Sequence, residues 1–190
     1  MERTIATTET GNKSPLEVRK SPIAGRGCFA TEVIHKGETI RTLVGEKVNG
    51  LELDERIALG EFTLGMDLQI NDNLFLILGS PDVYFNHSCA PNAAIRGENE
   101  LFAIGDIAEG EEITFDYSTT IGINREPEWL FDNEDWSMQC SCRADDCRGQ
   151  VESFLSIPQK NLQRYLELGA LPNFITNKLV SSPEQELVKV

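Results

Sequence analysis

Apolar residues recur along this chain mostly in short alternating runs, which is the pattern of half-buried β-strands. Two stretches predict hairpins: FTLGMDLQINDNLFLIL alternates on both sides of 71–73, and AAIRGENELFAIGDI on both sides of 97–99. Further short strands are predicted at 28–34 and at 113–117. Many short strands with turn signals and almost no long helix predict a mostly-β fold with short helices.

Two segments carry a helical pattern instead. Residues 49–60 predict one short helix with Leu53 and Ile57 on one face. A second helix is expected after Ser156, which would form a capping box with Gln159, and Gly169 would end it. Its apolar face would carry Leu162, Tyr165 and Leu166. The residues from Asn177 onward read as a loose tail.

At 190 residues and 40% hydrophobic content, the chain is long enough for one domain with a buried core. Its formal net charge of −14 argues against the phosphate backbone of a nucleic acid as a primary partner. Twelve acidic residues and one basic residue lie between Glu98 and Asp135. Such a region would attract a Lys/Arg-rich peptide, or it is only a solvated face.

The first fourteen residues contain charged side chains and no apolar run, so a secretory signal is not expected. No stretch approaches the ~18 apolar residues of a membrane helix. We therefore expect an intracellular protein without membrane contact. Disulfides are rare in that compartment, and the five cysteines need another explanation.

Three cysteines are spaced C-x-C-x4-C, at Cys140, Cys142 and Cys147. In an intracellular chain this cluster indicates zinc held by thiolates, although fortuitous free thiols are the alternative. A structural zinc site needs a fourth ligand. Cys89 is preferred to Cys28, because Cys28 has the apolar context of a small buried hydrophobe. A carboxylate of the cluster could also serve, from Asp145 or Asp146.

Cys89 belongs to YFNHSCAPN (84–92), a stretch that fits neither helix nor strand. Its Asn, His and Ser side chains compete with regular backbone hydrogen bonds, and Pro91 stops a helix or central strand. It predicts an ordered functional loop or a surface turn. Upstream, GRG at 25–27 would let the backbone approach a ligand closely, or would form an ordinary β-turn.

Four motifs in order resemble the SET-domain protein-lysine methyltransferases with a cysteine-rich post-SET segment. They are GRG at 25–27, NHSCAPN at 86–92, GEEITFDY at 110–117 and CSCRADDCRG at 140–149. The resemblance covers roughly residues 15–155. It implies the SET fold, in which small curved β-sheets surround a pseudoknot. It also implies S-adenosylmethionine as methyl donor and a structural zinc ion.

The resemblance divides the chain into four parts. We expect a disordered N-terminus (1–14), a SET domain (15–122, with an insert region at 49–80), a post-SET zinc segment (123–155) and a C-terminal helix and tail (156–190). The zinc ligands would be Cys89, Cys140, Cys142 and Cys147. The cofactor would be bound by Arg26, Gly27, Tyr84, Asn86, His87 and Tyr117.

The resemblance assigns the chemistry to two aromatic residues. The Tyr117 hydroxyl would orient the substrate amine and polarise the methyl group, unless Tyr117 is only a core tyrosine bonded to the backbone. Phe115, two residues earlier on the same strand face, occupies the position that sets how many methyl groups are added. His87 is expected to hold the loop by hydrogen bonding rather than to transfer a proton.

Three positions depart from the family pattern. Many relatives have tyrosine where this chain has Phe62, and Arg-Phe where it has Val83 and Tyr84. Many also have an aromatic residue where it has Gln150, a place that Phe154 would take over. The Phe62 departure raises the question whether an active-site hydroxyl is missing.

The leading hypothesis is a protein-lysine N-methyltransferase that acts on a basic protein such as a histone, and not directly on nucleic acid. The second is a catalytically weak or inactive SET-fold module that binds peptide or cofactor, and the third is a plain zinc-binding adaptor. A eukaryotic source would imply the nucleus and chromatin, and any other source the cytoplasm.

Overall fold

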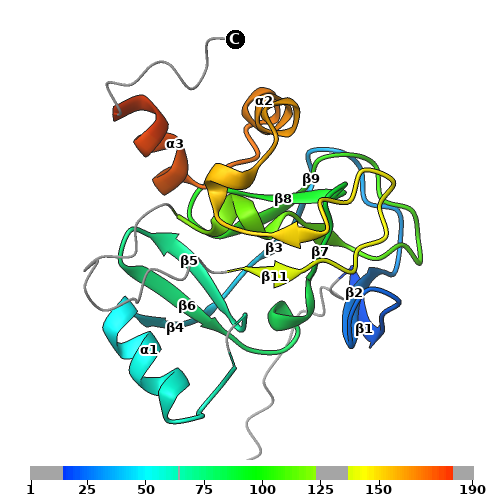
Figure 1. Cartoon of the computed structure of the whole chain (residues 1–190). Helices are drawn as coiled ribbons and strands as arrows, with labels where there is room; N and C mark the ends of the chain where they lie inside the picture. Colours follow the sequence, from blue (N-terminus) through cyan, green and yellow to red (C-terminus); the bar gives the residue numbers. More distant parts are fainter. Residues whose placement is uncertain (1–14, 64, 123–136, 182–190) are drawn as a thin grey trace, which may run out of the picture.

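The computed structural model describes residues 15–63, 65–122 and 137–181, and shows small sheets with short helices at the edges (Figure 1). The N-terminus predicted to be disordered (1–14) and residues 123–136, the first part of the predicted post-SET segment, lie outside these residues. Within them, five sheets of two or three strands replace a single large sheet. The prediction of a mostly-β fold with short helices is confirmed.

Two sheets have three antiparallel strands each, in the orders β3-β9-β8 and β4-β6-β5. The first consists of β3 (Thr39–Thr42), β9 (Glu100–Ala103) and β8 (Ala93–Arg96). The second consists of β4 (Gly45–Val48), β6 (Leu74–Leu78) and β5 (Asp67–Asn71). The hairpins β5–β6 and β8–β9 confirm the turns predicted around 71–73 and 97–99.

Three smaller sheets have two strands each. The strands β1 (Leu16–Lys20) and β2 (Arg26–Ala30) form an antiparallel hairpin, as do β11 (Met138–Gln139) and β12 (Gln150–Val151). The strands β7 (Asn86–His87) and β10 (Thr114–Phe115) pair in parallel. This parallel pair brings the GEEITFDY motif beside the Asn-His loop, as the expected knot requires.

The strand predicted at 113–117 is shorter than expected. It covers only Thr114–Phe115, and Tyr117 begins the 3₁₀-helix η2 (Tyr117–Thr120). The cause is Asp116, whose side chain accepts a hydrogen bond from the Ser118 N–H and turns the chain. At 28–34, Ile34 makes only an isolated bridge to Ile107, so no second strand forms there.

Helix α1 (Gly50–Ala58) confirms the helix predicted at 49–60. Its N-cap is Asn49, whose side chain accepts a hydrogen bond from the Glu52 N–H at 3.0 Å. Leu53 is fully buried against β4 and β6, in a cluster with Val48 and Phe75. The apolar face of the helix and the apolar faces of the two strands therefore pack together in one small core.

Helix α2 (Gln159–Leu168) starts differently from the prediction. The capping box was wrong, because Ser156 lies in the 3₁₀-helix η4 (Phe154–Ser156) and donates to the Ser153 carbonyl at 2.8 Å. Pro158 takes the N-cap position without a side-chain bond. Gly169 ends the helix with φ 61°, as predicted. Of the predicted apolar face, Tyr165 is buried but Leu166 is 37% exposed.

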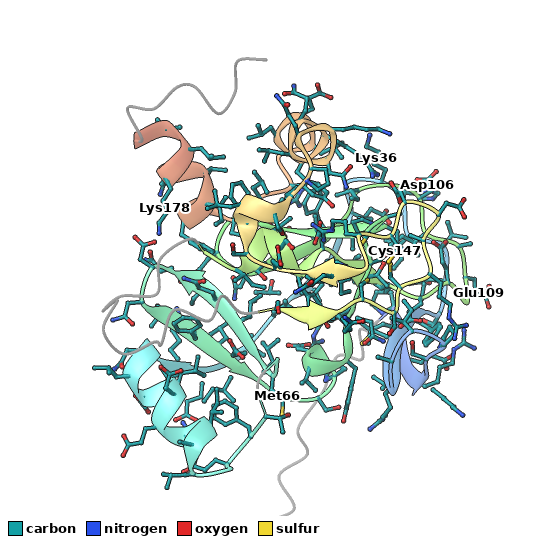
Figure 2. The ribbon with its side chains drawn as sticks, in the orientation of Figure 1. Lys36, Met66, Asp106, Glu109, Cys147 and Lys178 are labelled. Atoms are coloured by element: carbon teal, nitrogen blue, oxygen red, sulfur yellow. The ribbon has the colours of Figure 1, made fainter. Side chains whose placement is uncertain are left out.

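The tail predicted from Asn177 is helical as far as Ser181, because α3 spans Asn173–Ser181. Phe174 and Ile175 are buried in a second core, which α2 and α3 form with the β8–β9 hairpin. Lys178 extends from α3 towards the β5–β6 hairpin (Figure 2), where its Nζ lies 2.6 Å from Asp72 Oδ1. None of the described helices has both the length and the apolar character that a membrane crossing requires.

Candidate active site and metal centre

The loop between β1 and β2 is held open by polar contacts rather than by packing. The Ser21 hydroxyl accepts hydrogen bonds from the N–H groups of Ile23 and Ala24 at 2.9 and 3.3 Å. The same hydroxyl donates to the Glu112 carboxylate at 2.8 Å. Gly25 has φ +46°, a conformation that favours glycine. The GRG sequence therefore lies at the end of a loop whose conformation is fixed by hydrogen bonds, and it does not form an ordinary β-turn.

Gly27 allows the β2 strand to approach Glu112. A Cβ atom at this position would lie 2.2 Å from Glu112 Oε1, so no larger residue fits without displacing the carboxylate. Glu112 also accepts a hydrogen bond from Asn86 Nδ2 at 2.7 Å. Glu112 thus joins the β1–β2 loop to the Asn-His loop, a role that was not predicted from the sequence.

The Asn86 amide nitrogen is used to hold the β1–β2 loop. Besides Glu112, it points to the carbonyl oxygens of Arg26 at 3.0 Å and Ala24 at 3.3 Å. The Arg26 guanidinium stacks over the Tyr84 ring at 4.3 Å and donates to its hydroxyl at 3.0 Å. The structure therefore brings the predicted cofactor residues together, with Asn86 acting as a support for the loop backbone.

A hollow opens beside these loops. It is lined by Ala24 of the β1–β2 loop, by Asn86 and His87, by Tyr117, and by Met138 and Gln139 of β11. Loop residues that offer backbone polar groups line this hollow together with apolar side chains. Such a combination is typical of small-ligand sites. Because β11 belongs to the cysteine-rich segment, this hollow exists only when that segment is in place.

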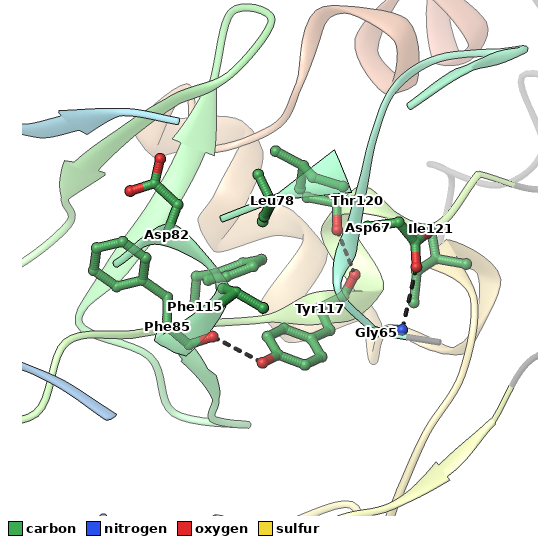
Figure 3. Close-up of a pocket in the computed structure, with 11 residues that line it drawn as sticks. Gly65, Asp67, Leu78, Asp82, Phe85, Phe115, Tyr117, Thr120 and Ile121 are labelled. Atoms are coloured by element: carbon green, nitrogen blue, oxygen red, sulfur yellow. Dashed lines mark hydrogen bonds between the residues drawn. The ribbon is translucent and has the colours of Figure 1, made fainter. Parts of the chain in front are cut away.

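Tyr117 also borders a second cavity (Figure 3). Its lining is mainly apolar and includes Leu68, Leu78, Val83, Phe85, Phe115 and Tyr117. Asp67 and Asp82 also border it. The cavity volume is about 50 Å³, enough for a few waters or an extended alkyl chain but not for a larger ligand.

Tyr117 forms part of the wall of both cavities. Its hydroxyl donates to the Phe85 carbonyl oxygen at 2.8 Å, so a lone pair of the phenol oxygen remains to accept another hydrogen bond (Figure 3). Burial raises the pKa of Tyr117, and the hydroxyl stays neutral. The Phe115 and Tyr117 rings are tilted against each other with centroids 4.9 Å apart.

Asp82 is buried near the cavity but already has partners. It forms an ion pair with Arg41 and accepts a hydrogen bond from the Val44 N–H at 3.0 Å. A buried carboxylate with a cation and a backbone donor is satisfied structurally. It therefore fixes the position of η1 (Asp82–Tyr84) and is not a free base.

The cysteine cluster assembles as the spacing predicts. Cys89 Sγ lies 3.8 Å from Cys140 Sγ, although the two residues are 51 positions apart. Thiolates around a tetrahedral zinc ion with ~2.3 Å bonds lie ~3.8 Å apart, so this pair fits a metal site. Cys142 Sγ accepts a hydrogen bond from the Cys89 N–H at 3.5 Å. The Cys147 thiol neighbours those of Cys140 and Cys142.

One atom each from His87, Cys89, Cys140 and Cys142 lies within 4.8 Å of the others, and such a group can hold a metal ion. Burial raises the pKa of Cys142, but hydrogen bonds from the N–H groups of Cys89 and Ala144 and from the Cys140 and Cys147 thiols together outweigh it and bring that pKa to about 7. A thiol that ionises near neutrality suits a metal ligand. Cys28, in contrast, is fully buried away from the cluster and points to the Pro81 carbonyl at 3.5 Å.

His87 lies unexpectedly close to the cluster. Its Nε2 is 3.3 Å from Cys89 Sγ, and its Nδ1 accepts a hydrogen bond from the Tyr117 N–H at 3.2 Å. A neutral imidazole that accepts at Nδ1 carries its proton on Nε2, which then points at the sulfur. This arrangement suits His87 as a hydrogen-bond donor to the cluster, and the Cys147 thiol is then a further candidate ligand.

The three departures have different structural meanings. Phe62 packs beside the α1 core with Arg56 above its ring at 5.6 Å, and does not line the narrow cavity. Gln150 lies exposed on β12. Phe154 is buried in the second core and does not line the narrow cavity. Val83 lines the cavity, whereas Tyr84 pairs with Arg26.

The acidic region does not form one free wall in the part that is described. Glu98 pairs with Lys47 at 3.3 Å, and Glu100 with Arg96 at 2.7 Å. Glu112 and Asp116 are hydrogen-bonded inside the molecule. Asp106 and Glu111 are exposed but accept hydrogen bonds from the Lys36 N–H and from Asn92 Nδ2, at 2.8 Å each, and Glu109 is exposed. The five acidic residues at 123–135 lie outside the described residues.

Comparison with known proteins agrees with this geometry. A family model described as the SET domain matches residues 25–118. The chain is 30% identical over 174 residues to a histone-lysine N-methyltransferase, H3 lysine-9 specific, from Fusarium mangiferae, covering 74% of this chain and 49% of that protein. It is 31% identical over 150 residues to a histone-lysine N-methyltransferase, H3 lysine-4 specific, from Mycosarcoma maydis, covering 72% of this chain and 10% of that protein.

A variant-silencing SET domain-containing protein of Plasmodium falciparum is 32% identical over 149 residues, covering 70% of this chain and 5% of that protein. The chain thus spans about half the length of the Fusarium relative and a tenth or less of the other two. The matched residues contain the β1–β2 loop end, the Asn-His loop and the Phe115–Tyr117 turn. With the parallel β7–β10 pair and the two cavities that meet at Tyr117, they show that this chain belongs to the SET-domain family.

Proposed function

We propose that this protein transfers methyl groups from S-adenosylmethionine to lysine side chains of a basic protein. The observation that carries the proposal is the position of Tyr117 in the walls of two separate cavities. One cavity suits a small cofactor, and the other suits an alkyl chain that ends at the tyrosine hydroxyl. Donor and acceptor would enter from different sides and meet at Tyr117.

The narrow cavity addresses the main obstacle of this reaction. A lysine amine has a pKa of about 10.4 and is protonated at neutral pH, so it cannot attack a methyl group until it loses that proton. Removal from water into an apolar cavity disfavours the ammonium form. Leu68, Val83 and Phe115 provide such a lining.

Tyr117 then orients the amine. Because its hydroxyl proton is donated to the Phe85 carbonyl, the phenol oxygen is available to accept an amine N–H. That contact would direct the nitrogen lone pair towards the neighbouring hollow. When bound there, S-adenosylmethionine supplies an electrophilic methyl group on a positively charged sulfur.

Phe115 would influence how many methyl groups are added to one lysine. Its ring lies against Tyr117 and carries no hydroxyl that could hold a water molecule or the amine in one position. The methylated amine therefore keeps room to turn. This supports successive methylation, to a di- or trimethylated product.

The cofactor would be held by the β1–β2 loop and by the Asn-His loop. Arg26 and Gly27 offer backbone groups, and Tyr84 and Asn86 fix that backbone through the contacts described above. His87 and Tyr117 close the hollow. The zinc ion would be structural, with four cysteine ligands and no open position for chemistry.

The substrate class rests on the relatives and on charge. Two of the relatives bear the name histone-lysine N-methyltransferase, and this chain has a net charge of −14. Asp67 at the cavity would favour an approaching cation. We infer a histone or another basic protein as substrate, and a chromatin substrate would place the protein in the nucleus.

The test compares the wild type with Tyr117→Phe. Both are incubated with S-adenosylmethionine labelled in its methyl group, mixed histones and cell extract. We expect labelled protein from the wild type and at least about a hundredfold less from the variant, since one positioned catalytic group contributes 10²–10⁴-fold. Cofactor binding by the wild type without transfer to any protein would support a non-enzymatic binding module instead.

A further inference from the structure

Asp116 stands in the sequence between the two aromatic residues of the proposed reaction, Phe115 and Tyr117, and is 1% exposed. Its Oδ1 accepts hydrogen bonds from Arg148 Nη2 at 2.5 Å and from the Ser118 N–H at 3.1 Å. Its Oδ2 accepts a hydrogen bond from the Tyr165 hydroxyl at 3.0 Å. Both oxygens are therefore satisfied, and two of the three donors come from the chain beyond the matched SET domain.

Arg148 also contacts the cysteine cluster. Its N–H and Nε lie 3.3 and 3.5 Å from Cys89 Sγ. Its remaining guanidinium nitrogen, Nη1, is buried and has no hydrogen-bond partner among the described residues. One side chain thus connects a metal-ligand candidate to the carboxylate that shapes the Phe115–Tyr117 turn.

Tyr165 connects the same carboxylate to helix α2. It is 1% exposed and belongs to the second core together with Phe102 and Phe174. Two further bonds tie this part of the chain to the turn. Ser118 Oγ donates to the Glu152 carbonyl at 2.7 Å, and the Phe154 N–H donates to the Ile121 carbonyl at 2.9 Å.

A contribution to stability alone explains this arrangement poorly. A buried ion pair costs desolvation and is weak evidence for stability, whereas its best-attested use is to specify one arrangement. Here the pair leaves a buried donor unsatisfied, which adds a further cost. The groups it aligns are Cys89 on one side and the backbone on either side of Tyr117 on the other.

We propose that Arg148 and Tyr165 are positioning residues, which lock the Asp116 carboxylate and thereby fix Tyr117 relative to the metal centre and helix α2. The C-terminal segment therefore completes the catalytic turn and does not merely cover it. This inference rests on the proposed function only in its effect on catalysis. The lock itself is a property of the fold.

The test uses Arg148→Lys and Tyr165→Phe, with Arg164→Lys as the matched control. Lysine keeps the positive charge but cannot reach both Cys89 and Asp116 with a rigid fork of donors. Phenylalanine keeps the packing of α2 and removes only the hydroxyl. Arg164 lies exposed on the same helix, next to Tyr165. Thermal melting checks that each variant is folded.

Hydrogen exchange followed by mass spectrometry measures whether Asp116 holds the turn around Tyr117, and this measurement needs no cofactor. The reporters are the amide protons of Tyr117 and Ser118, which are bonded to His87 and Asp116. Loss of a hydrogen bond to a charged group should speed their exchange about tenfold in both test variants and leave it unchanged in the control. Release of zinc to a chelator should accelerate about tenfold in Arg148→Lys, as for other residues that support metal ligands.

Kinetics then read the consequence for catalysis. We expect kcat to fall about tenfold in both test variants while KM for the peptide stays within twofold, because the cavity lining is unchanged. Unchanged exchange at Tyr117 and Ser118 in both variants would overturn the lock. Faster exchange with an unchanged kcat would overturn the positioning role. A wild type that transfers no methyl group would refute the proposed function, while the exchange data would still decide the lock.

Discussion

Cys89→Ser is the most direct perturbation of the metal centre. The Cys89 sulfur lies 3.8 Å from Cys140 Sγ, 3.3 Å from His87 Nε2 and 3.3 Å from the Arg148 N–H. Serine replaces a thiolate by a hydroxyl that stays protonated at neutral pH and reaches less far. The substitution therefore removes a ligand and at the same time the acceptor of the surrounding N–H groups.

The expected size follows from the ligand count. Structural zinc in small domains is bound with an apparent free energy of about 10–16 kcal/mol, so one of four ligands accounts for about 3 kcal/mol. That corresponds to about a hundredfold weaker zinc binding. Because β11 immediately precedes Cys140 and lines the cofactor hollow with Met138, we also expect weaker binding of S-adenosylmethionine.

The assay measures the zinc content of the purified protein and the rate of transfer to a colorimetric chelator. Cys28→Ser is the matched control, because Cys28 lies in a buried cluster away from the metal-ligand candidates, and among the described residues its thiol contacts the Pro81 carbonyl. We expect about one zinc ion per chain in the wild type and in the control. Equal loss of zinc from both variants would refute the ligand assignment.

Three further predictions concern the reaction and one buried thiol. Phe115→Tyr should shift the product towards monomethyl-lysine, as read by mass spectrometry of a peptide substrate; an unchanged product distribution would contradict the role of Phe115. In the wild type, kcat/KM should rise about tenfold per pH unit from 7 to 9, because the free substrate amine loses its proton near pH 10.4, whereas the raised pKa of Tyr117 adds no descending limb there. Burial, with a further contribution from nearby Asp82, raises the pKa of Cys28 from 9.0 to about 12. The contribution of this neutral thiol to stability is therefore complete below pH 9 and is lost as the pH approaches 12. Alkylation at pH 9 should leave Cys28 unmodified in the folded protein, and rapid modification would show that it is accessible.

Much of the sheet architecture could be predicted from local sequence. The β5–β6 and β8–β9 hairpins have alternating strands around Asn- and Gly-containing turns, and both the register and the turn are encoded within about fifteen residues. Helix α1 carries its own N-cap at Asn49. Where a local signal and the tertiary contacts agree, sequence reasoning is sufficient.

Helix α3 and the start of α2 could not be predicted in the same way. The α3 sequence NFITNKLVS has β-branched and polar residues that give a weak helical pattern. It forms a helix because Phe174 and Ile175 dock into the second core. The serine expected to cap α2 is used two residues too early, in a 3₁₀ turn. In both places tertiary packing overrides local preference.

The same distinction between local signals and tertiary contacts applies to the candidate site. The metal-ligand candidate Cys89 was found because chemistry restricts the choice to a few cysteines. Glu112, Asp116 and Arg148 were missed, since their importance depends on partners 26 to 91 residues away. A signal was nevertheless present, because Asp116 and Arg148 stand inside the family motifs FDY and CRG, next to residues that were assigned roles.

The loop YFNHSCAPN (84–92) shows why cofactor and metal should be coupled. Asn86 holds the β1–β2 loop, His87 accepts from the Tyr117 N–H, and Cys89 belongs to the metal cluster, all within four residues. A rigid segment of that length cannot shift at one end without shifting at the other. Because β7 also pairs with β10, movement of the loop would displace the strand that carries Phe115. Metal loss should therefore reduce cofactor affinity and the precision of methyl transfer together, and a metal-free protein with normal cofactor affinity would contradict this coupling.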